Sequence, residues 1–409
     1  MSSEFRYTSG NSPPERLMRT LAPISLVVSL LGLEPSPALA GDGLAQTPPM
    51  GWNSWNKFSC NVSEKLIRGA ADAMVSSGMK AAGYEYVVID DCWQTKRDEK
   101  GTIVADPERF PSGMKALAAA VHAKGLKFGI YSDAGTMTCA KRPGSKDHEA
   151  QDAKTYAEWG VDYLKYDWCN TDGQDTRDAY MKMSHALRAT GRPIVFSICE
   201  WGNSKPWIWA QGIGHLWRAT GDIQDCWDCS KSWGGMGLVH IIDLMADLYP
   251  FSGPRHFNDP DMLEVGNGGL TLEENRSHFS FWALFAAPLM AGNDLAAMTP
   301  EIRDILTHRE VIAIDQDALG MQGRKVRDSG ANEVWMKPLS DGSRAVILFN
   351  RGSEEASIAV AWDEIGIFPG AKARVRDLWK KADVGILTGR YEAKVAPHGV
   401  VMIRITPQY

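Results

Sequence analysis

The chain has 409 residues, of which 44% are hydrophobic and 23% are charged, and its formal net charge at pH 7 is -6. This composition is typical of a globular protein and excludes a disordered or fibrous one. The length favours one large domain with a smaller one beside it. Because no run of Lys and Arg could neutralise a phosphate backbone, we expect no nucleic-acid partner.

The N-terminal segment has the pattern of an export signal. Arg16 and Arg19 precede an apolar run at 20–33, and an Ala-Leu-Ala tripeptide ends at Ala40. The apolar run is shorter than the roughly 20 residues that a membrane-spanning helix needs. We therefore predict a signal peptide at 1–40, a secreted or periplasmic protein, and no membrane association after cleavage.

Between residues 50 and 317, β-rich segments alternate with amphipathic helical ones. The expected strands are eight, at residues 51–55, 84–91, 127–133, 161–168, 193–201, 216–222, 256–262 and 288–294. Expected helices between them include 65–82, 113–124, 150–159 and 177–190, where apolar residues recur every three or four positions. Eight such units predict an α/β fold, a (β/α)₈ TIM barrel over residues 41–322, with its active site at the carboxyl ends of the strands.

After residue 322 the pattern changes to short alternating strands separated by Gly, Asp and Pro turns. The expected strands lie at 333–337, 344–350, 357–361, 373–377 and 400–405. This pattern predicts a C-terminal antiparallel β-sandwich domain at 323–409. We expect this domain to cap the barrel, and independent carbohydrate binding is the alternative.

Two carboxylates stand at the ends of expected strands. Asp167 follows Lys165 and Tyr166 at the end of the fourth strand, and Asp222 closes the sixth, four residues after Arg218. A retaining glycosidase needs two carboxylates, one to attack the anomeric carbon and one to protonate the leaving oxygen. A strand-end Asp can equally cap a helix, so the pattern alone predicts a carboxylate-lined barrel mouth and no substrate.

A series of longer motifs, in the same order, resembles the α-galactosidases (melibiases) of glycoside hydrolase family 27. These are Thr47-Pro48-Pro49-Met50-Gly51-Trp52-Asn53-Ser54-Trp55-Asn56, Val88-Ile89-Asp90-Asp91-Cys92-Trp93, Gly129-Ile130-Tyr131-Ser132-Asp133, Leu164-Lys165-Tyr166-Asp167-Trp168-Cys169, Ser197-Ile198-Cys199-Glu200-Trp201-Gly202, Trp217-Arg218 with Gly221-Asp222-Ile223, and Asn258-Asp259-Pro260-Asp261-Met262-Leu263. The resemblance covers nearly the whole chain after residue 47. It implies the same barrel and C-terminal β domain as the pattern above.

The resemblance also implies roles for individual residues. Asp167 is similar to the family's nucleophile and Asp222 to its acid/base. Asp90 and Asp91 are similar to the pair that binds the 4- and 6-hydroxyls of galactose. The remaining positions that match sugar contacts are Trp55, Tyr131, Lys165, Arg218 and Asp261.

An Asp-Asp pair such as Asp90-Asp91 could instead bind a hard cation. No further ligand spacing supports a metal cage, and the family resembled needs no ion. We therefore expect neither a metal nor a cofactor.

The residues expected at the sugar's 2-position determine specificity within this family. Galactosidases have a Glu and a bulky neighbour there, and Glu200 and Trp201 match that pattern. The resemblance thus implies an exo-acting α-galactosidase that releases terminal non-reducing α-D-galactose from a galactose-containing oligosaccharide or glycan. The alternatives are an α-N-acetylgalactosaminidase, a β-L-arabinopyranosidase, and a non-catalytic galactose-binding protein.

Seven cysteines in an exported chain are disulfide candidates, and the odd number leaves at least one unpaired. By resemblance, Cys60 pairs with Cys92 and Cys139 with Cys169. Cys226 and Cys229 could form a disulfide, stay as free thiols, or provide half of a zinc site. The family's usual partner for Cys199 is absent near Gly214, so we expect a reduced, buried thiol.

Overall fold

The computed structural model of the chain describes residues 43–408. The predicted signal peptide lies outside these residues. Within the described part, no helix is both long enough and apolar enough to cross a membrane.

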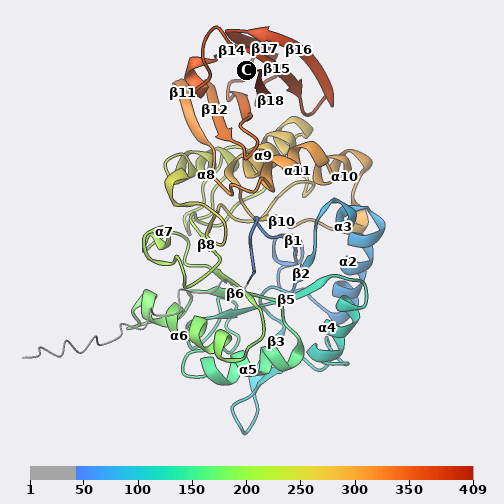
Figure 1. Cartoon of the computed structure of the whole chain (residues 1–409). Coiled ribbons are helices and arrows are strands. Elements are labelled where there is room, and N and C mark those ends of the chain that lie inside the picture. Colours follow the sequence, from blue (N-terminus) through green and yellow to red (C-terminus); the bar gives the residue numbers. More distant parts are fainter. Residues whose placement is uncertain (1–42, 409) are drawn as a thin grey trace, which may run out of the picture. The chain divides into compact units, whose positions relative to one another are not determined.

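An eight-stranded parallel sheet forms the centre of the first domain, as predicted (Figure 1). Its spatial order is β10-β1-β2-β5-β6-β7-β8-β9, and every hydrogen-bonded pair is parallel. The ring closes just after β9, where Leu263 forms a parallel bridge with Ala291 of β10. The strands are β1 Met50–Asn53, β2 Tyr86–Val88, β5 Lys127–Asp133, β6 Tyr163–Asp167, β7 Val195–Ile198, β8 Leu216–Arg218, β9 Phe257–Asp259 and β10 Leu289–Ala291.

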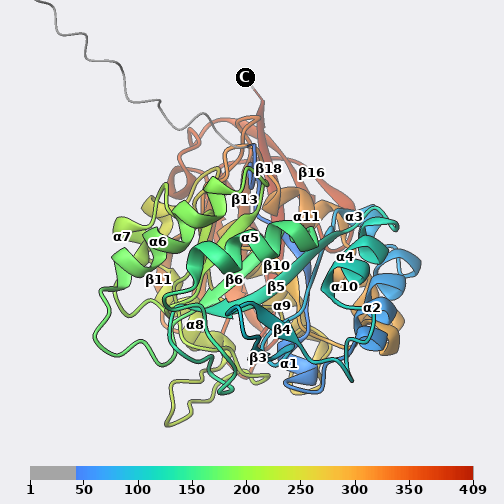
Figure 2. The same cartoon turned by 90° about the horizontal axis from the view of Figure 1, so that it is seen from below.

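Helices surround this ring, as Figure 2 shows for α2, α4, α5 and α6. The helices are α1 Trp55–Phe58, α2 Glu64–Ser76, α3 Met79–Ala82, α4 Met114–His122, α5 Glu149–Trp159, α6 Thr176–Ala189, α7 Pro206–Trp209, α8 Leu238–Met245, α9 Leu272–Phe285, α10 Pro300–Leu306 and α11 Arg309–Asp315. The single helix expected at 65–82 is two helices, because Gly78 between them has a φ of 89°. A left-handed residue interrupts an α-helix, and glycine adopts that conformation without a steric cost.

Alternate strand residues serve two different cores. Val87, Phe128 and Leu164 pack with the surrounding helices in the larger cluster. Tyr86 and Tyr163 belong to a smaller cluster that fills the barrel interior. This alternation follows from the two-residue period of a strand, and it leaves the carboxyl ends of the strands free to carry polar groups.

The C-terminal domain consists of two antiparallel sheets. The larger has the order β11-β12-β13-β18-β15-β16, and the smaller pairs β14 with β17. The strands are β11 Arg324–Ser329, β12 Asn332–Pro338, β13 Arg344–Asn350, β14 Ala356–Ala361, β15 Lys372–Asp377, β16 Ala382–Thr388, β17 Arg390–Val395 and β18 Val400–Gln408. A short hairpin of the first domain pairs β3 Gln94–Arg97 with β4 Ile103–Ala105.

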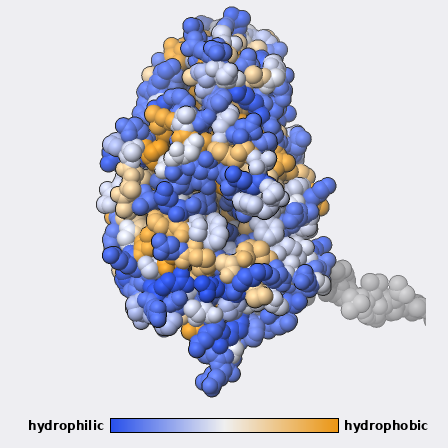
Figure 3. All heavy atoms as spheres, turned by 180° about the vertical axis from the view of Figure 1, so that it is seen from behind, coloured by the Kyte–Doolittle hydropathy of each residue, from blue (hydrophilic) through white to orange (hydrophobic). Residues whose placement is uncertain are grey.

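Helices α9, α10 and α11 lie between the barrel strands and this larger sheet (Figure 1). The α9 segment is buried along nearly all of its length and begins with a capping box between Thr271 and Glu274. On the surface, hydrophobic residues form small patches among hydrophilic ones, as one face shows in Figure 3.

Candidate active site

A cavity of about 630 Å³ opens where the carboxyl ends of the barrel strands meet. Its lining includes every catalytic and sugar-binding residue predicted from the sequence except Glu200. The predicted residues in the lining are Trp55, Asp90, Asp91, Tyr131, Lys165, Asp167, Trp201, Arg218, Asp222 and Asp261. The carboxylates of Asp167, at the end of β6, and Asp222, after β8, therefore share one cavity.

Several of these side chains lie beyond the strands on which they were expected. Asp91 and Asp222 follow β2 and β8 in loops, and Cys92 and Asp261 have φ values of 77° and 88°. The strands are shorter than predicted because the chain turns sharply to bring acidic side chains over the barrel mouth.

Asp167 is the last residue of β6 and is buried. Its Oδ2 accepts a hydrogen bond from the Tyr131 hydroxyl (2.9 Å), and its Oδ1 accepts one from the Trp168 backbone N–H (3.0 Å). Burial raises the pKa of Asp167 to about 6, although the charge of Lys165 acts in the opposite direction. The two hydrogen bonds fix the carboxyl group in place.

Lys165 forms its ion pair with Asp90 and not with Asp167. The Lys165 Nζ lies 2.9 Å from Asp90 Oδ2, which also accepts a hydrogen bond from Asn53 Nδ2 (2.7 Å). Asp91 is held separately, because its two oxygens accept the backbone N–H groups of Cys92 and Ala140. These contacts hold two adjacent acidic side chains in the lining of one cavity, ready to accept hydrogen bonds from hydroxyl groups.

Arg218, also in the cavity lining, joins two carboxylates. Its Nη2 lies 2.9 Å from Asp222 Oδ1 and 3.0 Å from Asp261 Oδ2. The Asp222 side chain is 41% exposed, whereas those of Arg218 and Asp261 are buried. Although partial burial raises the pKa of Asp222, the Arg218 guanidinium outweighs that effect and holds this pKa below its usual range.

The structure differs from the expectation at Glu200. Its Oε2 accepts the Ser204 backbone N–H (2.7 Å), and its Oε1 is buried without a hydrogen-bond partner in the described part of the chain. Burial raises the pKa of Glu200 to about 7. The next residue, Trp201, has a φ of 58°, and this turn places the indole in the cavity lining while the carboxyl group stays outside it.

Three disulfides join Cys60 to Cys92, Cys139 to Cys169, and Cys226 to Cys229. The first two pairs were predicted, and the third selects one of the open alternatives for the C-x₂-C segment. Cys199 is a buried free cysteine, as expected.

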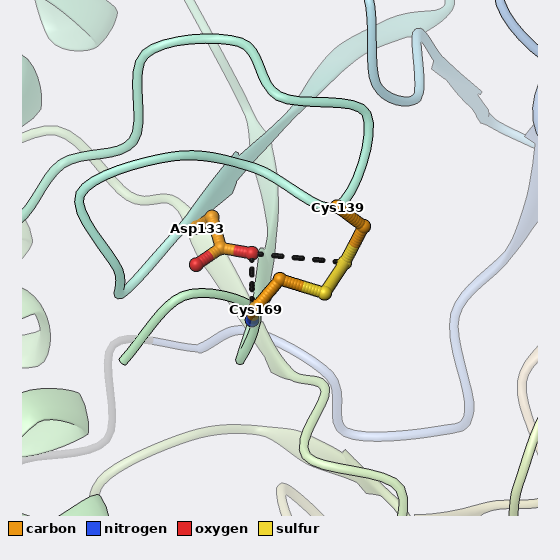
Figure 4. Close-up of side chains that lie close together, drawn as sticks. All are labelled: Asp133, Cys139 and Cys169. Atoms are coloured by element: carbon orange, nitrogen blue, oxygen red, sulfur yellow. Dashed lines mark hydrogen bonds between the residues drawn. A yellow bond between two sulfur atoms is a disulfide. The ribbon is translucent and has the colours of Figure 1, made fainter. Parts of the chain in front are cut away.

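Asp133 lies beside the disulfide between Cys139 and Cys169 (Figure 4). Its oxygens accept the backbone N–H groups of Gly135 and Cys169, and burial raises its pKa to about 9. These three side chains come close enough to suggest a metal site. The two sulfurs are bonded to each other, however, and metals bind cysteine as the free thiolate. The donor set therefore does not fit a metal ion.

Several residues in the cavity lining were not singled out from the sequence. They are Asn56, Lys57, Ser59, Ile223, Gln224, Asp225, Trp233, Met262, Glu264 and Asn267. Burial raises the pKa of Glu264 to about 8, and its Oε1 accepts a hydrogen bond from Asn56 Nδ2 (2.6 Å). Glu264 follows the 258–263 motif directly, so the motif's position was an available signal. Trp233 had no such signal.

Comparison with known proteins places both domains in one family. The profile described as alpha galactosidase A matches residues 47–317, and that of the alpha galactosidase C-terminal beta sandwich domain matches residues 329–405. Alpha-galactosidase A of Cellvibrio japonicus is 52% identical over 398 residues, covering 94% of this chain and 98% of that protein.

Solved structures agree with these matches. Alpha-galactosidase I of Mortierella vinacea superposes with a TM-score of 0.88 at 39% identity, covering 90% of this chain and 98% of that one. An α-galactosidase of Saccharomyces cerevisiae, solved with raffinose, has a TM-score of 0.86 at 31% identity and covers 90% of this chain and 99% of that one.

Proposed function

The chain belongs to the α-galactosidases of glycoside hydrolase family 27, and on that premise we propose that it is a retaining, exo-acting α-galactosidase. It hydrolyses terminal non-reducing α-D-galactose from galactosides through a covalent galactosyl-enzyme. The observation that carries this proposal is the pair of carboxyl groups, Asp167 and Asp222, that line the same sugar-sized cavity.

The reaction requires two displacements. In the first, a carboxylate oxygen of Asp167 bonds to the anomeric carbon, the bond from that carbon to the glycosidic oxygen breaks, and the Asp222 proton goes to the departing oxygen. In the second, Asp222 takes a proton from water, the water oxygen bonds to the anomeric carbon, and the ester bond to Asp167 breaks. The two inversions return the α-configuration, and both carboxyl groups return to their starting states.

The resting site does not hold the proton where the first step needs it. Asp222 is ionised beside Arg218, whereas burial favours the protonated form of Asp167. Two carboxylates in one site titrate as a pair that shares one proton. Substrate binding then has to move this proton to Asp222, where the glycosidic oxygen competes with the Arg218 guanidinium for the Asp222 carboxyl group.

The binding side of the site is matched to galactose. Asp90, Asp91 and Lys165 offer acceptors and a donor to the 4- and 6-hydroxyls, and Trp55 offers a ring to the apolar face of the pyranose. Lys165 orients Asp90 through their ion pair. Arabinopyranose has no 6-hydroxyl group, so an enzyme that binds it does not need a second carboxylate there. The two adjacent acidic residues therefore favour galactose.

Trp201 supports galactose over N-acetylgalactosamine. Its indole lies in the cavity lining, in a turn where Trp201 and Gly202 both have positive φ values. A bulky ring there leaves no room for an acetamido group at the sugar's 2-position. A non-catalytic binding protein is disfavoured because both carboxyl groups are present. The predicted signal peptide supports secretion or a periplasmic location, with galactose-containing oligosaccharides or glycans as substrates.

The deciding experiment follows hydrolysis of an α-galactoside by NMR. We expect α-galactose as the first product and mutarotation to the β-anomer later, whereas β-galactose as the first product would exclude a covalent intermediate. Faster cleavage of an α-N-acetylgalactosaminide or a β-L-arabinopyranoside than of the α-galactoside would transfer the assignment to that sugar.

The nucleophile is tested separately with Asp167→Asn. An amide cannot form the glycosyl ester, so we expect kcat to fall by about four orders of magnitude, while galactose affinity changes far less. Calorimetric titration with galactose measures the affinity. Turnover within tenfold of the unchanged enzyme would remove Asp167 from the reaction.

A further inference from the structure

A buried carboxyl group in the cavity lining takes no part in the mechanism above. Glu264 belongs to that lining, is only 5% exposed, and directly follows Leu263, the residue at which the barrel ring closes. Burying a carboxyl group costs free energy unless hydrogen bonds compensate for the lost water. The partners of Glu264 therefore indicate what this side chain does.

The barrel ring closes through few backbone contacts between β9 and β10. The other neighbouring strands pair over at least two residues, whereas this joint of the described chain has one bridge, between Leu263 and Ala291. The Leu263 N–H donates to the Met290 carbonyl (2.8 Å), and the Gly292 N–H donates to the Leu263 carbonyl (3.0 Å). Side-chain contacts across this joint therefore contribute more to its geometry than they would between longer strands.

The Glu264 side chain crosses the joint. Its Oε1 accepts a hydrogen bond from Asn56 Nδ2 (2.6 Å), and its Oε2 accepts one from Asn267 Nδ2. Asn56 lies in α1 directly after Trp55, whereas Asn267 lies in the loop between β9 and α9. The Glu264 backbone N–H donates to His278 Nε2 of α9 (3.0 Å). One residue thus connects α1, the loop after β9, and α9.

The helix α1 is held at two points near the sugar-binding ring. At its start, the Trp55 N–H donates to Asn53 Oδ1 (2.9 Å). One residue later, Asn56 is bonded to Glu264 and lies close to the backbone of Gly292, where a Cβ atom would be only 3.0 Å from the Asn56 Cβ. The Trp55 backbone is therefore fixed between these two anchors, and only the second one crosses the joint.

The chain on the other side of the joint has anchors that do not need the Glu264 carboxyl group. His278 packs edge-on against Trp282 with the ring centroids 4.0 Å apart, and Trp282 Nε1 donates to the Asp261 carbonyl (2.7 Å). Burial lowers the pKa of His278 to about 3, so the ring is neutral and can accept the Glu264 backbone N–H. Removal of the carboxyl group should consequently displace α1 and leave Asp261 in place.

We propose that Glu264 is a positioning residue, which holds Trp55 against the apolar face of galactose by fixing Asn56 across the joint of the barrel. This inference rests on the function proposed above and adds a residue to it. Glu264 acts through Asn56 and does not touch the sugar. A ring that is already fixed loses little conformational freedom when a ligand binds, so the contribution of Glu264 is to galactose affinity.

The test measures galactose affinity by calorimetry, together with kcat and KM for raffinose. In Glu264→Ala we expect the dissociation constant of galactose and the KM to rise about tenfold, since stacking on one ring contributes roughly that factor. The kcat should change less than twofold, because the lost interaction is made equally in the ground state and the transition state. Glu264→Gln should restore most of the affinity. An amide keeps an acceptor for Asn56 and offers an N–H to Asn267 Oδ1, which is buried without a partner among the described residues.

A second variant tests whether Glu264 acts through Asn56. Asn56→Ala removes the same hydrogen bond from the other side, so we expect the same tenfold loss of affinity, and no larger loss when it is combined with Glu264→Ala. A loss of about a hundredfold in the double variant would mean that the two side chains act independently, and would overturn the proposal. If Glu264→Ala does not fold, Asn56→Ala tests the same bond, and unchanged affinity there also overturns it.

Glu333→Ala is the matched control for the loss of a buried carboxyl group. Glu333 is 2% exposed, accepts a hydrogen bond from Trp335 Nε1 (2.7 Å) in the C-terminal domain, and lies outside the cavity lining. We expect this variant to be less stable but to bind galactose as before. Unchanged affinity in Glu264→Ala, or an equal loss in Glu333→Ala, overturns the positioning role. If the unchanged enzyme bound galactose but hydrolysed no α-galactoside, the proposed function would fall, and the affinities would still decide the role of Glu264.

Discussion

Arg218 sets the protonation of the catalytic pair because it contacts one member and not the other. Its guanidinium lies 2.9 Å from Asp222, whereas Asp167 accepts hydrogen bonds from a tyrosine hydroxyl and one backbone N–H within the described residues. In the resting site the single proton of the pair therefore favours Asp167. The reaction requires that Asp167 and Asp222 together carry one proton. The bound substrate determines which of the two holds it.

This arrangement predicts a basic limb in the pH profile. The pair keeps its one proton below the pKa of about 6 at Asp167 and loses it as the pH rises through that value. Above it both carboxyl groups are ionised, and none can protonate a leaving sugar. We expect kcat/KM for raffinose to fall tenfold for each pH unit above about 6.

α-Galactosyl fluoride supplies the control for this basic limb of the pH profile. Fluoride departs without a proton, so its kcat/KM should decline much less over the same range of pH. If both substrates lost activity in parallel, another group would be responsible, and Glu200, whose pKa is about 7, is the first candidate.

The acid role of Asp222 predicts an effect that depends on the leaving group. In Asp222→Ala, formation of the galactosyl-enzyme from an oligosaccharide should slow by two or more orders of magnitude, since the sugar now leaves as an alkoxide. An activated aryl galactoside should lose far less. Stopped-flow measurement of the first turnover checks this, and equal losses on both substrates would contradict the assignment.

At the scale of single elements, the sequence predicts the strands whose burial requires a recognisable pattern of apolar residues. All eight barrel strands were located because strands buried on both faces are apolar runs, and five strands of the C-terminal domain were located by alternation. Strands β11, β16 and β17 were missed. The charged sequence Arg324–Ser329 and the exposed positions of Ala382–Thr388 give no alternating signal, because these two strands lie at the edges of the larger sheet.

The residues of the cavity likewise differ in how well the sequence predicts their positions. Residues within long motifs, such as Asp91 and Tyr131, lie in the cavity as expected. The sequence did not predict that Glu200 lies outside the cavity lining or that Trp233 lies in it. Positions in a loop depend on backbone turns, which give no periodic pattern in the sequence. Of the two neighbours expected in the site, Trp201 lies in the cavity lining and Glu200 does not, and the backbone of Trp201 has a positive φ.

The loop after Asp222 gives a prediction at this scale. Trp227 fixes the loop by stacking on His398 and by an edge contact with Phe349, whose ring centroid lies 5.8 Å away. In Trp227→Ala we expect trypsin to cleave after the exposed Lys231 several times faster than in the unchanged protein. Cleavage mapped by mass spectrometry measures this rate. Phe368→Ala, at an exposed aromatic residue of the C-terminal domain, is the control, and an unchanged rate in Trp227→Ala would mean that the disulfide alone holds the loop.

At the scale of the whole described molecule, the larger C-terminal sheet is buried on both faces. Val334 and Val346 pack toward the smaller sheet, whereas Trp335 and Phe349 pack against Phe281 of α9. This contact supports the capping role expected for the domain. We propose a boundary between residues 322 and 323, since the Gln322 side chain still bonds to groups of the barrel, while β11 begins at Arg324.

A buried lysine crosses this boundary. Lys337 of β12 donates to the carbonyl oxygens of Ala283 (3.2 Å) and Ile314 (2.7 Å), which lie in the last turns of α9 and α11. A cation at two helix C-termini satisfies carbonyls that the helices cannot. Burial nevertheless lowers the pKa of Lys337 to about 8, despite the opposing charges of Asp315 and Asp317.

We expect Lys337→Met to lower the free energy of unfolding by about 3 kcal/mol, because the carbonyls of Ala283 and Ile314 lose the ammonium donor and Asp315 loses a nearby positive charge. The pH dependence has a definite sign. The pKa of this amine is about 8 in the folded protein and 10.5 in the unfolded chain, so between these values the unfolded chain binds more protons and stability rises with pH. The variant lacks this rise, so the difference in unfolding free energy between the two proteins should widen from pH 7.5 to 9.5.

Denaturant unfolding at several pH values measures this difference. The double variant Lys337→Met with Asp315→Asn, which removes both charges, should recover part of the lost stability. Parallel stability curves would show that the pKa of Lys337 is not lowered in the folded protein, and would contradict the prediction.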